Sequence, residues 1–168
     1  MKILVVGSGG REHAIAWKLS KSLHKPELHC VPGNAGIVQL AKCEAGRIDD
    51  PDGLARLAEK LKVDLTIVGP EAPLVAGIAE SFADRRLRML GPSRKASRLE
   101  GSKVFAKQFM ARHSVPTARF RIADSPDLAR QLGEREFKFP VVIKADGLAA
   151  GKGVAIANNK HEFDEAID

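Results

Sequence analysis

Apolar positions in the first 92 residues alternate between short continuous runs and helical stripes. Residues 2–6 form an apolar, β-branched run that stops at Gly7, and this pattern predicts a buried strand. Ile15, Leu19 and Leu23 then repeat with the spacing of one helix face. The same kind of apolar run predicts further strands at residues 28–31, 63–68 and 87–90.

Two further helices in this block have recognisable start signals. Asp50 and Pro51 form an N-cap and first-turn pair ahead of an apolar stripe. Pro73 starts a helix that carries Leu74, Ile78 and Phe82 on one face. Strands that alternate with helices predict an α/β fold with a doubly wound parallel sheet, Rossmann-like in class, over residues 1–92.

The pattern changes after residue 92. It predicts linking helices at 93–100 and 102–112, the second capped by Ser102, within a linking region of residues 93–116. It also predicts a short strand at 119–123, a helix starting at Ser125 and Pro126, a hairpin of strands 141–143 and 154–157, and a final helix around Phe163 and Ile167. A single hairpin cannot bury both of its faces, so residues 117–168 are expected to be an incomplete unit of a longer protein.

Composition and charge narrow the classes of partner. The net charge is +6, but the basic residues are scattered and Tyr is absent, which disfavours nucleic-acid binding. No apolar stretch is long enough for a membrane span, and no signal peptide is recognisable at the N-terminus. Cys30 and Cys43 form no metal-ligand pair or disulfide framework, which favours a cytoplasmic location.

The loop Gly7–Gly10 joins a strand to a helix, where backbone N–H groups can bind a phosphate. The third glycine of a dinucleotide-binding fingerprint would fall at Glu12, whose carboxylate would repel a pyrophosphate. A dinucleotide site is therefore disfavoured, while a tight turn with no ligand remains an alternative.

The segment Gly147–Gly153 is glycine-rich but departs from a P-loop. Asp146 stands where the first P-loop glycine would be, and no Ser or Thr follows Lys152. The segment can still wrap phosphates with its N–H groups, and the alternative is a solvated hairpin turn. Lys144, just before this segment, faces either solvent or an anion. Lys103 stands at the start of a helix, where a positive charge opposes the helix dipole and is unfavourable unless an anion lies nearby.

Two rigid turns follow other predicted strands. Glu71 stands between two prolines after Gly69, at the sheet edge where ligands bind in this fold class, and its carboxylate suits a diol. Glu71 could instead only complement a helix dipole. Residues 33–36 form the second turn, and the histidines show no metal-ligand spacing.

These motifs together resemble the glycinamide ribonucleotide synthetase family of the ATP-grasp superfamily. The resemblance covers essentially the whole chain and rests on residues 6–14 (VGSGGREHA), 32–36 (PGNAG), 68–75 (VGPEAPLV), 99–103 (LEGSK) and 144–153 (KADGLAAGKG). Each motif alone is weak to moderate, but five in this order are specific. The resemblance implies an α/β substrate-binding domain at 1–92 and the start of an ATP-grasp lid at 117–168.

The resemblance also implies an activity and a set of site residues. The activity is ATP-dependent joining of glycine to 5-phosphoribosylamine through glycyl phosphate, a step of purine biosynthesis that releases ADP and phosphate. Lys103 and Lys144 correspond to the catalytic and ATP-binding lysines, and the other implied ATP-binding residues are Gly147, Ala149, Ala150, Gly151, Lys152 and Gly153. The implied phosphoribosylamine-binding residues are Gly9, Gly10, Arg11, Gly33, Asn34, Gly36, Gly69 and Glu71.

The family's metal ligands have no counterpart in this sequence. ATP-grasp enzymes use Mg²⁺ or Mn²⁺, and we expect the ligands, with much of the adenine pocket, beyond residue 168. Residues 1–168 alone are therefore expected to be inactive. The alternatives are another ATP-grasp ligase of purine or carboxylation metabolism and a non-catalytic phosphate-binding module. The sequence does not indicate an oligomeric state.

Overall fold

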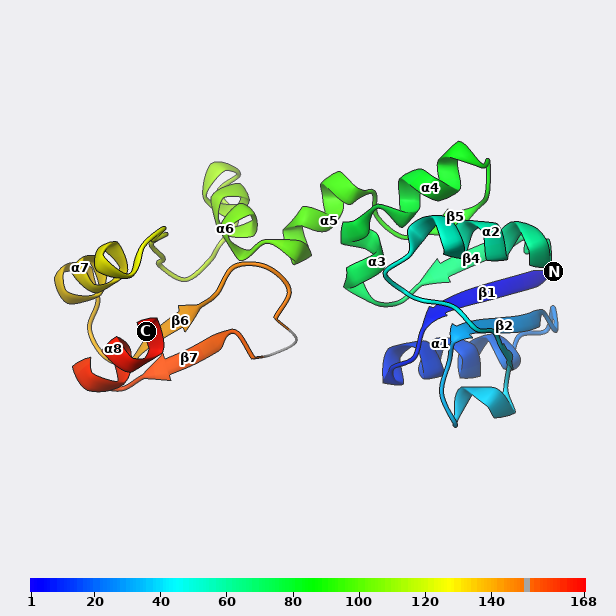
Figure 1. Cartoon of the computed structure of the whole chain (residues 1–168), viewed down its shortest axis with the longest axis horizontal. Coiled ribbons are helices and arrows are strands. Elements are labelled where there is room, and N and C mark those ends of the chain that lie inside the picture. Colours follow the sequence, from blue (N-terminus) through cyan, green and yellow to red (C-terminus); the bar gives the residue numbers. More distant parts are fainter. Residues whose placement is uncertain (150–151) are drawn as a thin grey trace. The chain divides into compact units, whose positions relative to one another are not determined.

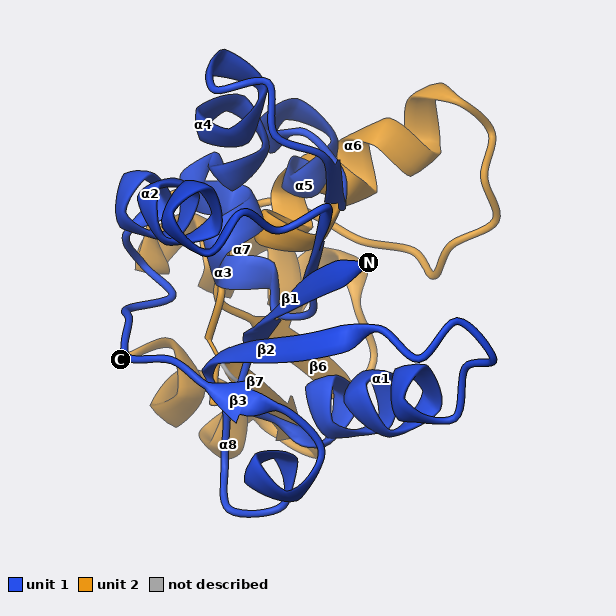
Figure 2. Ribbon diagram, turned by 90° about the vertical axis from the view of Figure 1, so that its right-hand side faces the viewer, with its two compact units in different colours: residues 1–98 blue, residues 99–168 orange. Residues whose placement is uncertain are grey.

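The computed structural model describes residues 1–149 and 152–168. It divides into two compact units, residues 1–98 and residues 99–168, coloured blue and orange in Figure 2. Each unit contains its own sheet, parallel in the first unit and antiparallel in the second. Within the described ranges, no helix is long and apolar enough to cross a lipid bilayer.

The first unit is a parallel sheet flanked by helices, with the strand order β3-β2-β1-β4-β5 (Figure 1). The strands are β1 (Lys2–Gly7), β2 (Glu27–Pro32), β3 (Lys42–Cys43), β4 (Leu65–Val68) and β5 (Met89–Leu90). The helices are α1 (Gly10–Ser20), the 3-10 helix η1 (Ile37–Gln39), α2 (Pro51–Leu61), α3 (Glu71–Ala76) and α4 (Ile78–Asp84), and α5 (Arg94–Gly101) begins in this unit and ends in the second. This arrangement confirms the expected α/β class and parallel sheet.

Strand β1 is buried on both faces because its side chains alternate between two cores. Leu4 and Val6 pack into a core shared with α2, α3 and α4, which includes Phe82. Ile3 and Val5 pack into the other core, on the side covered by α1 and η1. The continuous apolar run of residues 3–6 follows from this two-sided burial. Because the strands are parallel, their carboxyl ends share one edge of the sheet.

Local differences from the predicted elements occur where the apolar pattern is ambiguous. The helix expected from Pro73 begins at Glu71 and is broken at Gly77, whose φ of 96° separates α3 from α4. Helix α1 ends before Leu23, which is 97% exposed. Strands β4 and β5 begin two residues later than expected. Strand β3 was not predicted, because two residues are too few to show a pattern.

The second unit is a hairpin with helices. Strands β6 (Val141–Lys144) and β7 (Val154–Ala157) pair antiparallel, which confirms the predicted hairpin. The helices that lie wholly within this unit are α6 (Lys103–Arg112), α7 (Pro126–Glu136) and α8 (Lys160–Ile167). Ser102 and Ser125 cap α6 and α7 as expected, because each hydroxyl accepts a first-turn N–H.

The predicted strand at residues 119–123 is wrong. This segment has no regular secondary structure, and among the described residues it pairs with no strand. Arg119 and Arg121 instead donate to the two carboxylate oxygens of Glu136, at 2.9 and 3.0 Å. These two contacts hold the segment against α7.

Candidate functional site

Three loops meet at the carboxyl edge of the sheet in the first unit. They follow β1, β2 and β4, and backbone hydrogen bonds tie them to one another. Gly33 N–H donates to the Gly7 carbonyl at 3.2 Å, and Gly69 N–H donates to the Val6 carbonyl at 3.1 Å. The sheet register therefore brings together the glycines that the sequence predicts for one site.

Asn34 holds the loop after β2 against the loop after β1. Its side-chain amide donates to the Ser8 carbonyl at 2.8 Å. Its carbonyl oxygen accepts the N–H groups of Gly36 and Ile37, at 2.8 and 2.9 Å. A side chain at Gly36 would collide with the His13 ring on α1. The predicted polar turn is thus packed against the glycine loop, and its Asn side chain is engaged within the protein.

Glu71 lies within the same group of loops, in an ion pair with Arg11. The guanidinium and carboxylate are 2.9 Å apart, and Arg11 also donates to the Gly69 carbonyl at 2.5 Å. The Glu71 backbone N–H, and secondly Arg11, hold the pKa of the Glu71 carboxyl below its usual range. The Arg11 side chain is 61% exposed and the Glu71 side chain 35%. The pair therefore offers both a cation and an acceptor to a ligand at this edge.

Glu12 is a residue whose role the sequence did not reveal. The side chain turns inward, is 4% exposed, and accepts the Gly9 N–H at 2.7 Å. A Cβ added at Gly7 would lie 2.6 Å from Glu12, and one added at Gly69 would also collide with it. Glu12 therefore closes the glycine loop against the loop after β4. Its position three residues after the N-cap Gly9, as in a capping box, was the available signal.

The N-terminus of α1 is open to a ligand. The helix starts at Gly10, where an added Cβ would meet nothing within 4 Å. The first N–H groups of a helix have no intrahelical acceptor, and the helix dipole favours an anion there. The Glu12 carboxylate is buried and accepts the Gly9 N–H, whereas the guanidinium of Arg11 is exposed, so the outer side of this end of α1 suits a phosphate group.

The second unit brings Lys103 and the start of the glycine-rich segment together. Lys103 Nζ donates to the Gly147 carbonyl at 2.7 Å. Asp146 accepts the Ser102 hydroxyl at 3.1 Å and the Val104 N–H at 3.2 Å. The N–H of Val104, as the largest cause, lowers the pKa of the Asp146 carboxyl. The anion expected near Lys103 from its helix position is therefore present within the chain.

Lys144 lies on the exposed face of the hairpin. Its neighbours on this face are Val142 on β6 and Val154 and Ile156 on β7, which are 52%, 47% and 64% exposed. Beyond it, Ala145 N–H donates to the Gly153 carbonyl at 2.9 Å, and Lys152 N–H donates to the Ala149 carbonyl at 2.8 Å. The predicted site residues Ala150 and Gly151 lie outside the described residues.

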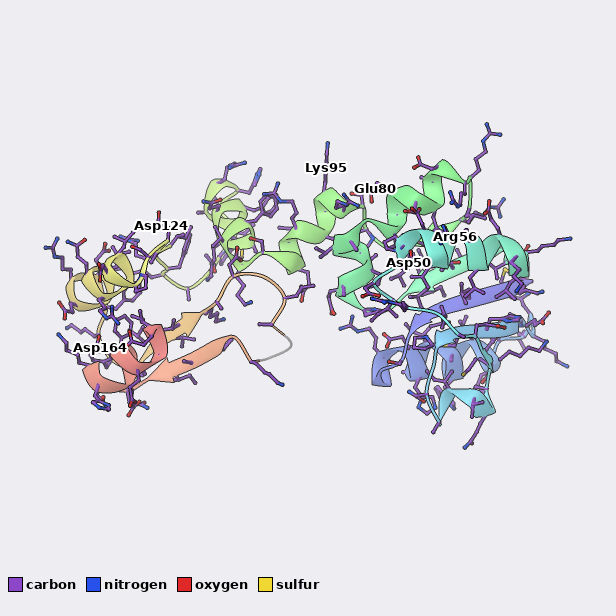
Figure 3. All side chains as sticks on the ribbon, viewed as in Figure 1. Asp50, Arg56, Glu80, Lys95, Asp124 and Asp164 are labelled. Atoms are coloured by element: carbon purple, nitrogen blue, oxygen red, sulfur yellow. The ribbon has the colours of Figure 1, made fainter. Side chains whose placement is uncertain are left out.

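A polar cavity of about 510 Å³ in the first unit has a different lining from the predicted site. Asp50 and Arg94 are among its lining residues, and Figure 3 labels Asp50 at the start of α2. Arg47 in the lining is already paired with Asp49, at 2.8 and 2.9 Å. No cluster of potential metal ligands occurs among residues 1–149 and 152–168.

Two family models match the chain, and the boundary between them lies close to the boundary between the two structural units. Residues 1–100 match the phosphoribosylglycinamide synthetase N domain, and residues 101–168 match the ATP-grasp (A) domain of the same synthetase. A phosphoribosylamine–glycine ligase of Xanthomonas campestris is 52% identical over 99% of this chain and 39% of that protein. One from Caldanaerobacter subterraneus is 51% identical over the whole chain and 40% of that protein. The chain thus spans about two fifths of the length of these relatives.

Solved structures give the same assignment. A phosphoribosylamine–glycine ligase from Thermotoga maritima superimposes with a TM-score of 0.76 at 36% identity, over 98% of this chain and 38% of that one. An N5-carboxyaminoimidazole ribonucleotide synthetase from the same organism has a TM-score of 0.75 at 20% identity, over 99% and 43%. At that identity the second match shows a common fold only.

Proposed function

The chain belongs to the phosphoribosylglycinamide synthetase family, and from that premise we propose that it contributes to ATP-dependent ligation of glycine to 5-phosphoribosylamine. The products are glycinamide ribonucleotide, ADP and phosphate, formed in the cytoplasm during purine biosynthesis. The observation that carries the proposal is the match of both family domains, in order, across residues 1–168. The names of relatives at about half identity support the same reaction.

We assign phosphoribosylamine to the first unit. Its phosphate suits the open N-terminus of α1 at Gly10, beside the guanidinium of Arg11. The carboxylate of Glu71, fixed by Arg11, is an acceptor for two neighbouring ribose hydroxyls. Gly33, Asn34 and the glycines of the first loop form the wall of this site through their backbone.

We assign ATP to the second unit. Lys103 and Lys144 supply positive charge for its phosphates, and the apolar face around Lys144 suits the adenine base. Gly147 and Gly153 provide N–H groups near the phosphates, and the side chain of Lys152 provides one further cation. A bound Mg²⁺ or Mn²⁺ would neutralise phosphate charge, and from the family resemblance we expect its ligands beyond residue 168.

The reaction then proceeds in two transfers. A carboxylate oxygen of glycine attacks the γ-phosphorus of ATP, ADP leaves, and glycyl phosphate forms. The amine of phosphoribosylamine attacks the acyl carbon, phosphate leaves, and the nitrogen loses a proton. Lys103 and Lys144 stabilise the negative charge that develops on the phosphoryl oxygens in the first transfer. Glu71 and Arg11 orient the amine-bearing substrate for the second.

A crossed pair of variants in the full-length gene product tests this assignment. Glu71→Gln removes a charged acceptor and is expected to raise KM for phosphoribosylamine about 10-fold to 100-fold, with KM for ATP unchanged. Lys144→Met keeps the aliphatic stem and removes the charge, so kcat/KM for ATP is expected to fall about 100-fold. Lys138→Met, an exposed lysine of the same unit, is the matched control. The measurement is glycine-dependent ADP release.

Two results would contradict the assignment. If Glu71→Gln raises KM for ATP and leaves KM for phosphoribosylamine unchanged, the first unit does not bind the amine substrate. If Lys144→Met has wild-type kinetics at an unchanged melting temperature, Lys144 only faces solvent. Absence of ADP release by the wild-type protein would refute the proposed reaction itself.

A further inference from the structure

Asp146 connects the end of strand β6 to the start of helix α6. Its two carboxylate oxygens each lie 3.1 Å from the Ser102 hydroxyl, and one of them also accepts the Val104 N–H. Ser102 in turn accepts the Phe105 N–H at 3.0 Å. The helix thus begins with two linked caps, one from its own N-cap residue and one from a residue more than 40 positions later.

The charge of Asp146 matters at this place. The first turn of α6 contains no acidic residue and begins with Lys103, whose cation opposes the positive end of the helix dipole. A carboxylate that accepts a first-turn N–H complements that dipole. Asp146 therefore offsets the unfavourable position of Lys103 and makes a lysine tolerable at the start of α6.

A separate hydrogen bond holds the Lys103 side chain next to Asp146. Lys103 Nζ donates to the carbonyl of Gly147, the residue after Asp146. Two side chains thus join residues 146 and 147 to the start of α6: that of Asp146, which accepts from Ser102, and that of Lys103, which donates to Gly147. Lys144 is only two residues earlier, at the end of β6. Asp146 therefore links the segment that carries Lys144 to the helix that begins with Lys103.

We propose that Asp146 is a positioning residue of the ATP site, which sets Lys103 and Lys144 at the separation that the ATP phosphates require. Its carboxylate oxygens are engaged with Ser102 and Val104, so it acts through the lysines and does not itself contact the nucleotide. This inference rests on the proposed ligase function and adds a residue whose role is to arrange the two cations.

The test uses three variants of the full-length gene product. Asp146→Asn keeps the shape and removes the charge, and Asp146→Glu keeps the charge with a longer reach. Asp124→Asn is the matched control, because Asp124 is an exposed acid of the same unit (labelled in Figure 3). KM for ATP, KM for glycine, kcat and the melting temperature are measured for each.

The expected result is a selective loss of ATP affinity. Asp146→Asn should raise KM for ATP about tenfold while KM for glycine stays within about twofold of wild type, because only the charged cap is weakened. Asp146→Glu should recover most of the loss, and Asp124→Asn should match wild type. A role in folding alone would lower the melting temperature and the amount of active enzyme without this split between the two KM values.

Each other outcome counts against the inference. If KM for ATP is unchanged in Asp146→Asn, or if Asp124→Asn raises it equally, Asp146 does not position the lysines. If both KM values rise together, or if Asp146→Glu is as impaired as Asp146→Asn in a folded protein, the charge is not the cause. A wild-type protein that does not use ATP would fail at the earlier step, the proposed function, and the inference would fall with it.

Discussion

The two units of the chain hold their candidate sites in different ways. In residues 1–98 the site loops extend from a parallel sheet whose faces both pack into apolar cores. In the described part of residues 99–168, the buried hydrophobic side chains are Ala157 and Phe163, and polar contacts such as that of Asp146 join the elements. The sheet that supports the first site therefore depends on packing, whereas the elements that carry the second site depend on charge and hydrogen bonding.

The largest difference between the two units is expected from Phe82→Ala in the first unit. Phe82 is 1% exposed, and its removal leaves a cavity, so the free energy of unfolding should fall by about 3–5 kcal/mol. Val142→Ala on the exposed hairpin face should change it by less than about 0.5 kcal/mol. Urea unfolding followed by circular dichroism measures both, and Trp17, the single tryptophan, reports on the first unit by fluorescence. Equal losses would show that the units do not differ as described.

A smaller loss of stability is expected from a substitution at Gly69, a site glycine that packs against the buried Glu12 side chain. Gly69→Ala places a methyl group against the buried Glu12 side chain and should destabilise the first unit by about 1–3 kcal/mol. It should also weaken phosphoribosylamine binding, because Glu12 closes the glycine loop. Gly10→Ala is the control for stability, since its added Cβ meets nothing within 4 Å. Trp17 fluorescence in urea measures the stability of each variant, and a harmless Gly69→Ala would mean that Glu12 moves freely.

The smallest change in folding stability per residue is expected from protonation of single carboxyl groups in acid. In the second unit, hydrogen bonds from Lys160 and Arg121 lower the pKa values of Glu134 and Glu136, and that from Val104 lowers the pKa of Asp146. A carboxyl group with a lowered pKa stabilises the fold above its unfolded pKa, and this contribution is lost as pH falls through the folded value. Acidification below about pH 4.5 should therefore begin to destabilise the second unit before the first, by a small amount because these carboxyls are exposed.

The first unit should resist the same titration further. A hydrogen bond from Lys42 is the main cause that lowers the pKa of Glu27 to about 2, so this contribution persists to stronger acid. Acid also removes the contributions of Asp49 and Glu71, whose pKa values are lowered, but the apolar cores of this unit contain no group that titrates in acid. Loss of helical circular dichroism before any shift in Trp17 emission is the expected order. The reverse order would contradict the distinction between the units.

Sequence reasoning succeeded where a local signal determined the local structure. The apolar run ending at Gly7 predicted β1 and its loop, and Asp50 with Pro51 predicted the start of α2, where Asp50 accepts the Gly53 N–H. The glycine-rich segment between two apolar runs predicted the hairpin. Each of these signals lies within a few residues of the feature that it predicts.

It failed where the structure depends on distant partners. The stripe through Leu74, Ile78 and Phe82 continues across Gly77, so the break between α3 and α4 was not visible in the spacing. The inward turn of Glu12 requires space beside Gly69 that only the sheet creates. The cap that Asp146 places on α6 likewise joins residues far apart in the chain. The site residues were recognised as a group through the family resemblance, and their contacts came from the structure.

The burial of Glu12 beside Gly69 also constrains the order in which this protein can change over generations. A side chain at position 69 collides with Glu12 while Glu12 keeps its length. Shortening Glu12 first removes the obstacle, but it leaves the Gly9 N–H without its acceptor. The two positions are therefore expected to vary together, and each single step between two functional combinations passes through a less fit intermediate.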